Sequence, residues 1–359
     1  MAQSKRPTNM KIALDVSPLQ SGHKVRGVGS YVTYLKKAIL AYFPENEYIF
    51  FENKKDIPNN VDLVHYPYFD PFFLSLPLIK KHKTVVTVHD LIPLVFPDHF
   101  PAGLKGMLRW QIQKYNLRHV DALITQSEAS KNDIMRIVAI PEEKISVAYL
   151  AADAVFKKNN ITRVHKAEMR KKYKLPEEFL LYVGDVTWNK NIPLLLNAVK
   201  DINVSLVMVG KALVSENVDE TNVWNNDIIE AQKLAKENSK VQRLGFLPAD
   251  DLIALYNLAT AFVFPSIYEG FGLPVIEAMQ SGCPVITTRE GSLEEVAGDA
   301  AYYFDGFSKE SLSEVIMHVM HSKELRKELK EKGFAQAKKF NWRKTAEETM
   351  AVYQRALQK

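Results

Sequence analysis

Two glutamates flank a glycine-containing turn in the second half of the chain. Glu269 and Glu277 have seven residues between them in the segment PSIYEGFGLPVIEAM, which follows an apolar run at residues 261–264. A strand that passes through a glycine turn into a helix leaves free N–H groups and a positive dipole end beside the turn, and these suit a diphosphate. Carboxylates accept hydrogen bonds from vicinal diols, as in dinucleotide-binding folds. Isolated glutamates would more simply complement a helix dipole and cap a turn, but the surrounding glycines favour a ligand site.

Three further segments carry candidate groups at predicted strand ends. Lys190 lies in YVGDVTWNKN at residues 182–191, where a cation can stabilise charge on a leaving group or can simply be a solvated lysine at a helix start. The segment RGVGSY at residues 26–31 opens a predicted helix. TVHDLIPL at residues 87–94 ends a strand with His89 and Asp90, for which the structural alternative is a buried histidine and a turn former.

These segments together resemble the retaining glycosyltransferases of family 4, in particular the mannosyltransferase-like group of polysaccharide assembly. The paired glutamates carry the resemblance, and it continues through GFL at 245–247, GCPVI at 282–286 and EVAGDAA at 295–301. The resemblance implies an α/β fold of the GT-B type, with two Rossmann-like doubly wound domains facing a central cleft.

The resemblance also assigns roles. It implies that Glu277 binds the ribose hydroxyls, Glu269 faces the transferred sugar, Lys190 neutralises the diphosphate and His89 positions the sugar, with Lys190, Glu269 and His89 as the catalytic residues. The other donor-binding positions that it implies are Gly27, Gly29, Gly184, Asn191, Phe246, Leu247, Gly270, Phe271, Gly272 and Leu273.

The chain departs from the family pattern at three places. Many members have an arginine where this chain has Asp185 or Asn189, so either Lys190 carries more of the charge or Arg26 or Lys211 assists it. Of the family's Asn-Gly-Val-Asp before the linker, only Asp153 matches, which puts the acceptor contacts there in doubt. In the segment ITQSEAS at residues 124–130, we expect the serine at 127 to cap a helix before any other role.

Composition and patterning predict two domains. The chain has 359 residues, 47% hydrophobic, and short apolar runs alternate with amphipathic helical patterns, which is typical of parallel sheets with crossover helices. We expect a flexible leader at 1–9, an acceptor-side domain at 10–172 that ends in a polar lysine-rich stretch, a nucleotide-sugar domain at 173–339, and a terminal helix at 340–359 that crosses back to the first domain. Strands are expected at 11–16, 48–51, 62–65, 84–89, 122–125 and 145–148, and at 179–183, 205–209, 241–244, 261–264, 284–287 and 301–304.

Charge and cysteine content bear on location and partners. A single cysteine and the lack of an apolar run of about 18 residues predict a cytoplasmic protein. Residues 1–174 carry 27 Lys and Arg against 16 Asp and Glu, whereas residues 175–359 carry 20 against 26. The segment 101–118 interleaves basic with apolar residues at helical spacing. It either packs its apolar face into the core or lies on an anionic membrane surface.

We therefore expect a retaining hexosyltransferase that moves mannose or glucose from a nucleotide diphosphate sugar to a glycan or lipid-linked glycan acceptor. No Asp-x-Asp motif, Cys/His cluster or Walker loop occurs in the sequence, so we expect no metal and no cofactor, and no nucleic acid partner. Two alternatives stay open at this point. One is a nucleotide-sugar epimerase of the same architecture, and the other is a subunit that binds nucleotide sugars without catalysis.

Overall fold

The chain forms two α/β units in a computed structural model that describes residues 9–20, 27–156 and 162–358. The first unit comprises Met1–Pro97, Ala102–Ala151 and Phe340–Lys359, and the second comprises Asp98–Pro101 and Ala152–Lys339. The change of unit thus comes at residue 152, 21 residues before residue 173, the start expected from the sequence, and the final helix lies with the first unit.

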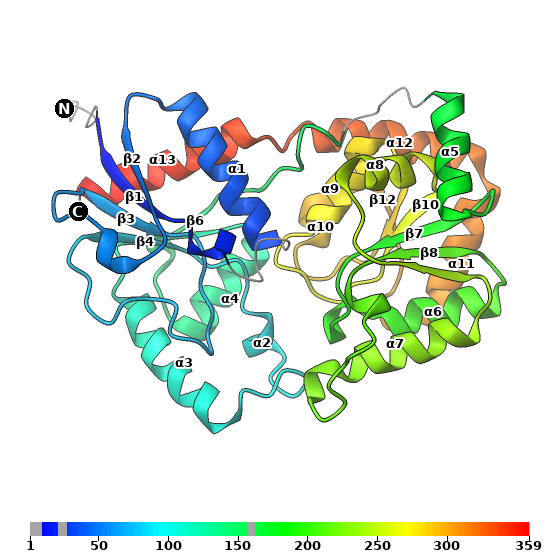
Figure 1. The fold of residues 1–359 in the computed structure, drawn as a ribbon, viewed down its shortest axis with the longest axis horizontal. Coiled ribbons are helices and arrows are strands. Elements are labelled where there is room, and N and C mark those ends of the chain that lie inside the picture. The colour runs from blue at the N-terminus through cyan, green and yellow to red at the C-terminus, as the bar shows by residue number, and fades with distance from the viewer. Residues whose placement is uncertain (1–8, 21–26, 157–161, 359) are drawn as a thin grey trace. The chain divides into compact units, whose positions relative to one another are not determined.

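The first unit is a parallel six-stranded sheet in the order β2-β1-β3-β4-β5-β6. Its strands are β1 (Lys11–Asp15), β2 (Glu47–Phe51), β3 (Leu63–Tyr66), β4 (Lys83–Thr87), β5 (Ala122–Thr125) and β6 (Ile145–Val147). Its helices are α1 (Gly27–Tyr42), α2 (Ile92–Val95), α3 (Gly103–Arg118), α4 (Glu128–Val138) and α13 (Trp342–Gln358). Helices α1 and α13 pack together on one face of the sheet, and α3 and α4 lie on the other (Figure 1).

The second unit repeats this plan with the strand order β12-β11-β10-β7-β8-β9. Its strands are β7 (Leu180–Val183), β8 (Leu206–Val209), β9 (Val241–Leu244), β10 (Ala261–Phe264), β11 (Val285–Thr287) and β12 (Ala301–Tyr303). Its helices are α5 (Arg163–Tyr173), α6 (Ile192–Asp201), α7 (Asn226–Glu237), α8 (Ala249–Leu258), α9 (Leu273–Ser281), α10 (Leu293–Ala297), α11 (Lys309–His321) and α12 (Lys323–Ala337). Helices α6, α7 and α11 cover one face, and α5, α8, α9 and α12 cover the other (Figure 1). All twelve expected strands are confirmed, with ends that differ by one or two residues.

The lysine-rich stretch that was expected to end the first domain forms a helix of the second unit. Residues 163–173 form helix α5, which the lysine-rich composition concealed. Thr162 caps its first turn by accepting a hydrogen bond from the His165 N–H, and the helix ends at Lys174 in the left-handed conformation. Helix α5 is held on α8 because Lys172 Nζ lies 2.7 Å from Asp251 Oδ2 and the Tyr173 hydroxyl donates to the same oxygen at 2.6 Å. This segment is therefore part of the second unit.

The final helix is tied to the first sheet by a buried polar chain. Tyr353 on α13 bonds to Nδ1 of His65 at 2.7 Å, and Nε2 of His65 bonds to the Thr87 hydroxyl at 2.8 Å. Thr87 also contacts the Tyr31 hydroxyl at 2.9 Å. Burial lowers the pKa of His65 to about 3, so this histidine is neutral at physiological pH. The chain joins α1, β3, β4 and α13 in one core.

Candidate functional site

The turn between β10 and α9 has the form that the sequence predicted. Gly272 precedes the helix with a φ of +103°, a conformation that residues with a Cβ rarely adopt, and a Cβ there would also lie 3.0 Å from Leu293. Pro274 occupies the first turn of α9. The Ser292 hydroxyl lies 2.8 Å from the Phe271 carbonyl oxygen and 3.0 Å from that of Glu269, so the turn is held from outside. The backbone conformation is thereby fixed before a ligand binds.

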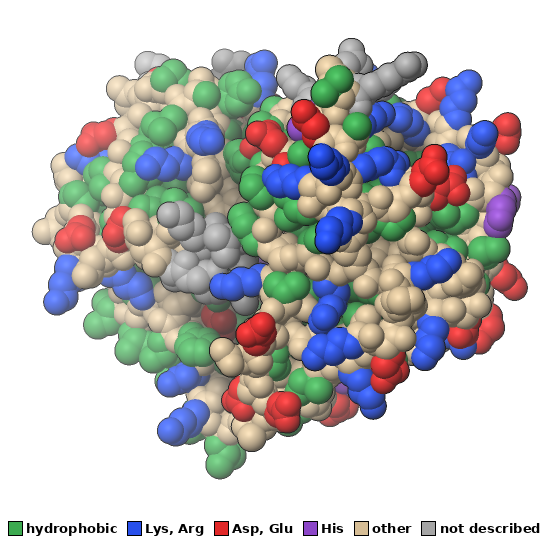
Figure 2. Space-filling view, turned by 45° about the vertical axis from the view of Figure 1, so that its right-hand side comes forward, with side chains coloured by type: hydrophobic (Ala, Val, Ile, Leu, Met, Phe, Trp, Pro, Cys, Tyr) green, Lys and Arg blue, Asp and Glu red, His purple; other side chains and the backbone are tan. Residues whose placement is uncertain are grey.

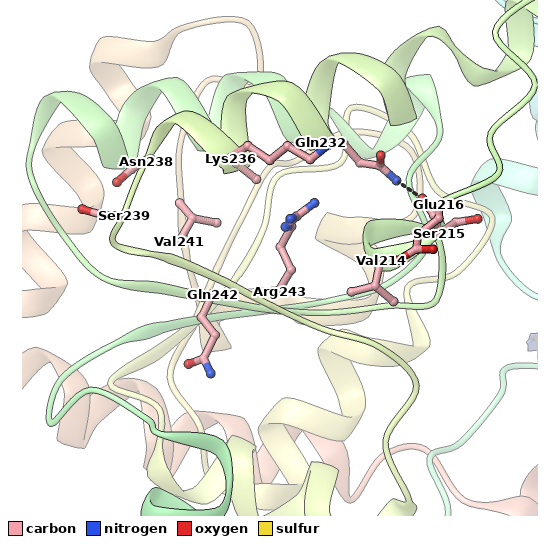
Figure 3. Close-up of a pocket in the computed structure, with 11 residues that line it drawn as sticks. Val214, Ser215, Glu216, Gln232, Lys236, Asn238, Ser239, Val241, Gln242 and Arg243 are labelled. Atoms are coloured by element: carbon pink, nitrogen blue, oxygen red, sulfur yellow. Dashed lines mark hydrogen bonds between the residues drawn. The ribbon is translucent and has the colours of Figure 1, made fainter.

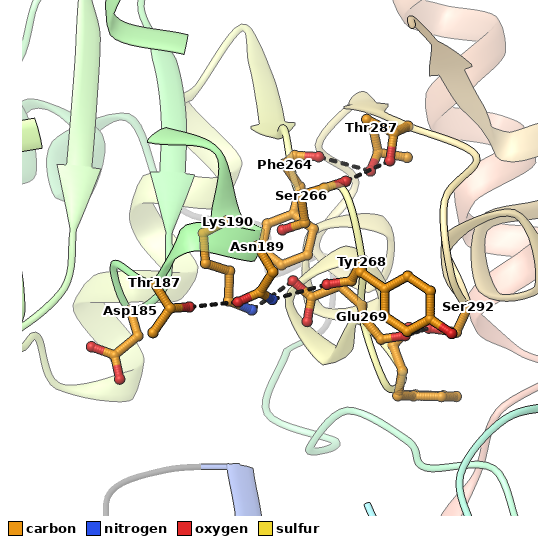
Figure 4. A network of polar contacts seen from close by, with 12 residues as sticks. Asp185, Thr187, Asn189, Lys190, Phe264, Ser266, Tyr268, Glu269, Thr287 and Ser292 are labelled. Carbon is orange, nitrogen blue, oxygen red and sulfur yellow. Dashed lines mark hydrogen bonds and ion pairs between the residues drawn. The ribbon is translucent and has the colours of Figure 1, made fainter. Parts of the chain in front are cut away.

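Lys190 and Glu269 form an ion pair beside this turn. Lys190 Nζ lies 2.6 Å from Glu269 Oε1, and the two side chains are 17% and 9% exposed (Figure 4). The ammonium group also lies 5.1 Å from the centre of the Phe264 ring. The loops after β7 and β10 therefore bring together the predicted cation and the carboxylate predicted to face the sugar.

Asn189 fastens these two loops together. Its side chain accepts a hydrogen bond from the Thr187 hydroxyl at 2.7 Å and donates to the Tyr268 carbonyl at 2.9 Å, and its backbone carbonyl accepts from the Ile267 N–H at 2.8 Å (Figure 4). Asn189 is only 4% exposed. This departure from the family pattern thus replaces a cation with a buried structural residue, a role that the sequence did not indicate.

Glu277 lies in α9, where its carboxyl group contacts a tyrosine hydroxyl. The Tyr256 hydroxyl on α8 donates to Glu277 Oε2 at 3.3 Å. Burial, assisted by the negative charge of Asp153, raises the pKa of Glu277 to about 8. The pair Leu255-Tyr256 belongs to the segments that resemble the family, but the resemblance implied no separate role for Tyr256.

The other predicted donor-binding positions of the second unit follow the strands β7, β9 and β10. Asn191 has a φ of +54° and donates from its amide to the Gly306 carbonyl at 2.8 Å. Gly184 follows β7, at a position where a Cβ would lie 2.7 Å from the Tyr182 hydroxyl oxygen. Phe246 and Leu247 follow β9, with Phe246 70% exposed and Leu247 buried. Gly270 lies in the turn, and Leu273 begins α9.

His89 follows β4 in the first unit, and both of its ring nitrogens have protein partners. Nε2 lies 2.9 Å from the Pro67 carbonyl oxygen, so it carries the proton, and Nδ1 is left to accept from the buried Gln126 amide. Tyr31 packs edge-on against the ring at a centroid distance of 5.0 Å. The Asp90 carboxylate holds this loop, because it accepts from the Ile92 N–H at 3.0 Å. The contact of Gln126 with the His89 ring was not predicted from the sequence.

The glycine loop of the first unit is described only in part. Gly27 and Gly29 lie in the first turn of α1, with Gly29 buried and open space where a Cβ at Gly27 would be. Arg26 lies outside the described residues. Ser127 caps α4 as expected, with its hydroxyl 3.0 Å from the Ser130 nitrogen.

A polar cavity of about 800 Å³ opens elsewhere in the second unit, between α7 and the edge strand β9. Arg243, Lys236 and Gln232 line it together with Val214 and Glu216 (Figure 3). Its lining includes none of the predicted site residues, so it is separate from the Lys190–Glu269 pair.

Two family models match the chain. Glycosyltransferase Family 4 matches residues 13–155, and Glycosyl transferases group 1 matches residues 165–336. The chain is 29% identical over 294 residues to O-antigen chain mannosyltransferase B of Escherichia coli, covering 81% of this chain and 75% of that protein. It is also 29% identical to a serotype-specific mannosyltransferase of Escherichia coli, over 80% of this chain but only 36% of that longer protein.

Solved structures share the architecture. Sucrose-phosphate synthase of Thermosynechococcus elongatus superposes with a TM-score of 0.76 at 20% identity, over 96% of this chain and 98% of that one. An Anabaena protein in complex with UDP and glucose gives a TM-score of 0.73 at 16% identity, over 96% and 99% of the two chains. These comparisons favour sugar transfer over the epimerase and the non-catalytic subunit. With its two parallel six-stranded sheets and the matches of both halves, the chain belongs to the family 4 glycosyltransferases and has the GT-B fold.

Proposed function

We propose that this glycosyltransferase moves a hexose, of the mannose or glucose type, from a nucleotide diphosphate sugar to a glycan or lipid-linked glycan acceptor during surface polysaccharide synthesis. The names of the two Escherichia coli relatives support mannose and an O-antigen type of acceptor. The observation that carries the proposal is the ion pair between Lys190 Nζ and Glu269 Oε1, 2.6 Å apart beside the N-terminus of α9. A phosphate group that enters there meets a cation and free backbone N–H groups together.

Each predicted residue then has a chemical task. Lys190 exchanges part of its contact with Glu269 for the donor diphosphate and stabilises the charge that develops on it. Glu269, freed from that contact, accepts hydrogen bonds from the transferred sugar. Glu277, oriented by the buried Tyr256 hydroxyl, holds the ribose hydroxyls, and the exposed Phe246 ring offers a surface for the base. His89, fixed by Gln126, positions the sugar from the first unit.

We propose retention at the anomeric carbon without a covalent enzyme intermediate. The bond between the sugar C1 and the diphosphate oxygen breaks, and its electrons stay on the departing diphosphate. The acceptor oxygen attacks C1 from the same face, and its proton passes to the diphosphate oxygen. Lys190 and the N-terminus of α9 supply positive charge to the leaving group, so the proposal needs neither a metal ion nor a cofactor.

We also propose that the protein works at the cytoplasmic surface of an anionic membrane. No helix within the described part of the chain is long and apolar enough to span a bilayer. Helix α3 buries Gly106, Gln113, Asn116 and Leu117, whereas Leu104, Met107 and Leu108 are 83%, 59% and 69% exposed. The expectation that its apolar residues pack into the core is therefore wrong for these three. An outward apolar face with Lys105 and Arg109 suits a headgroup layer.

A thermal-shift panel of nucleotide diphosphates and nucleotide sugars, without metal, tests the donor site. A donor that binds the native state raises the melting temperature by mass action. We expect a shift with one base, and we expect it to be lost in Lys190→Ala and Glu277→Ala but kept in Lys236→Ala, whose side chain lines the separate cavity. If no nucleotide shifts the wild type, or if both site variants respond like the wild type, the assignment of the donor site is wrong.

A further inference from the structure

Four lysines converge on a second cavity, in the first unit. This cavity of about 360 Å³ lies between η3 (Lys54–Asp56), the segment 77–82 and the strands β3 and β4. Lys54, Lys55, Lys80 and Lys81 line it with His82, and no acidic side chain is among its lining residues. The cavity lies beside the first residues of β4, whereas His89 follows the opposite end of that strand. It is therefore distinct from the donor site.

The lysines are placed to hold an anion. Lys54 Nζ donates to the Ser75 carbonyl at 3.0 Å and lies 5.9 Å from the centre of the Tyr66 ring, so this ammonium group is positioned by neutral groups. The negative charge of Asp15 acts on Lys54 and that of Asp121 acts on Lys80, and Asp121 is already engaged by Lys83 at 3.0 Å. Asp56 ends the same short helix as Lys54 and Lys55 but does not line the cavity. Partial burial lowers the pKa of both Lys54 and Lys80. An anion in the cavity would offset this desolvation and stabilise the charged lysines.

The mouth of the cavity is apolar. Ile79, which lines it, is 80% exposed, and its neighbour Leu78 is 65% exposed. A free inorganic anion gains nothing from these two side chains, whereas an anion that carries an acyl chain can bury them. The combination of a basic cavity and an apolar rim therefore favours an amphiphile.

The segment 73–75, which precedes this rim in the sequence, is tied to α3. Gln113 of α3 donates to the Ser75 hydroxyl at 2.7 Å, and Ser75 is the residue whose carbonyl accepts from Lys54. The same loop exposes Phe73 and Leu74, and the Arg109 guanidinium lies 5.6 Å from the centre of the Phe73 ring. The described residues of α3 include no aspartate or glutamate. Figure 2 shows green and blue side chains side by side over the lower left of the molecule, the region that holds α3 in Figure 1.

We propose that this lysine cavity binds the phosphate group of an anionic membrane lipid, while Leu78, Ile79 and the exposed residues of α3 contact its acyl region. The proposal rests on the membrane contact put forward above and is independent of sugar transfer. The lysine side chains supply the charge, and the cavity makes the contact selective for a phosphate headgroup over diffuse negative charge.

Three ligands separate the sources of the phosphate. They are vesicles of phosphatidylcholine with phosphatidic acid, a soluble dihexanoyl phosphatidic acid, and inorganic phosphate, each at matched ionic strength. The cavity variant is Lys55→Gln, Lys80→Gln, Lys81→Gln, which leaves the hydrogen-bonded Lys54 in place. The control variant is Lys323→Gln, Lys327→Gln, Lys338→Gln, which removes the same charge from exposed positions of the second unit. Dissociation constants come from vesicle co-sedimentation and from calorimetry.

Each lysine near an anionic leaflet contributes roughly a factor of five to binding, so the cavity variant should bind vesicles about 100-fold more weakly than the control. We expect the soluble lipid to show the same selective loss. Equal binding by the cavity and control variants would overturn the inference, and so would inorganic phosphate binding as tightly as the soluble lipid. If the wild type binds the soluble lipid through these lysines but no vesicles, the cavity is supported and the proposed membrane contact fails. We expect the thermal shift caused by the nucleotide to be unchanged in both variants. This control shows that the loss of lipid binding does not come from damage to the donor site.

Discussion

Glu269 and Glu277 are the same residue type on two sides of one turn, yet their surroundings give them different electrostatic states. Glu269 is 2.6 Å from an ammonium group, whereas Glu277 faces a tyrosine hydroxyl at 3.3 Å and has its pKa raised to about 8. The positive charge of the site therefore lies on the side assigned to sugar and diphosphate. The side assigned to ribose is held by a carboxyl group that is largely protonated near neutral pH. Glu269 is stabilised by its ammonium partner, whereas the charge of Glu277 depends on pH.

The largest effect should follow from removing the cation. Lys190→Met keeps most of the side-chain volume but leaves the Glu269 carboxylate, 9% exposed, without its partner. Breaking a buried pair from one side typically costs about 3–5 kcal/mol, because the remaining charge is desolvated and uncompensated. We expect urea denaturation at pH 7 to show a loss of stability of about 3 kcal/mol.

The double variant Lys190→Met, Glu269→Gln is the matched control for this prediction. It removes both charges and should recover most of the stability, while nucleotide binding stays lost because Lys190 is absent. A single variant as stable as the wild type would mean that water or another cation compensates Glu269, and the contrast between the two glutamates would then disappear.

The sequence was sufficient to find the ion pair's members but not the residues that hold them. Glu269, Glu277 and Lys190 were identified because their motifs resemble a family, and the strand-end pattern placed Lys190 and Glu269 on loops after two strands and Glu277 in the helix that follows. The roles of Asn189 and Gln126 were not predicted, because they depend on contacts with Tyr268 and His89, which are distant in the sequence. A single polar residue of this kind belongs to no repeated pattern, so the sequence does not indicate its partner.

A smaller effect, a dependence of stability on pH, should distinguish Glu277 from Glu269. Its pKa in the folded chain is about 8 against an ordinary 4.5, so between these values the native state binds a proton that the unfolded state has released. Stability should therefore fall as pH rises from 4.5 to 8, by up to about 1.4 kcal/mol per pH unit. Urea denaturation at half-unit steps should show this slope in the wild type.

Glu277→Gln serves as the comparison for that slope. The amide cannot release a proton, so residue 277 no longer contributes to the pH dependence. The free energy of unfolding of the variant should therefore rise relative to that of the wild type with every half pH unit above pH 5. Parallel stability curves for the two proteins between pH 5 and 8 would show that Glu277 is ionised in the folded chain, and would make the two glutamates alike.

The fold was more predictable than the site because alternating apolar runs report strands directly, and all twelve appear. Helix α5 was missed since its composition is dominated by lysine and arginine, and of its described side chains only Met169 is buried. The outward apolar residues of α3 were misassigned for the converse reason. Hydrophobic spacing predicts a helix and its amphipathicity, but it does not report which face the rest of the protein covers.

The smallest expected effect concerns the tyrosine that distinguishes Glu277 from Glu269. Tyr256→Phe removes the hydroxyl that donates to Glu277 Oε2, and this hydrogen bond lowers the pKa of Glu277 against the effect of burial. We expect a loss of about 1 kcal/mol and a pH profile of stability displaced to higher pH. Tyr173→Phe is the matched control, because its hydroxyl donates to the Asp251 carboxylate at 2.6 Å away from the donor site. Both variants should lose stability, but only Tyr256→Phe should move the pH profile. If the two profiles coincide with that of the wild type, the hydroxyl does not tune Glu277, and burial alone separates the two carboxylates.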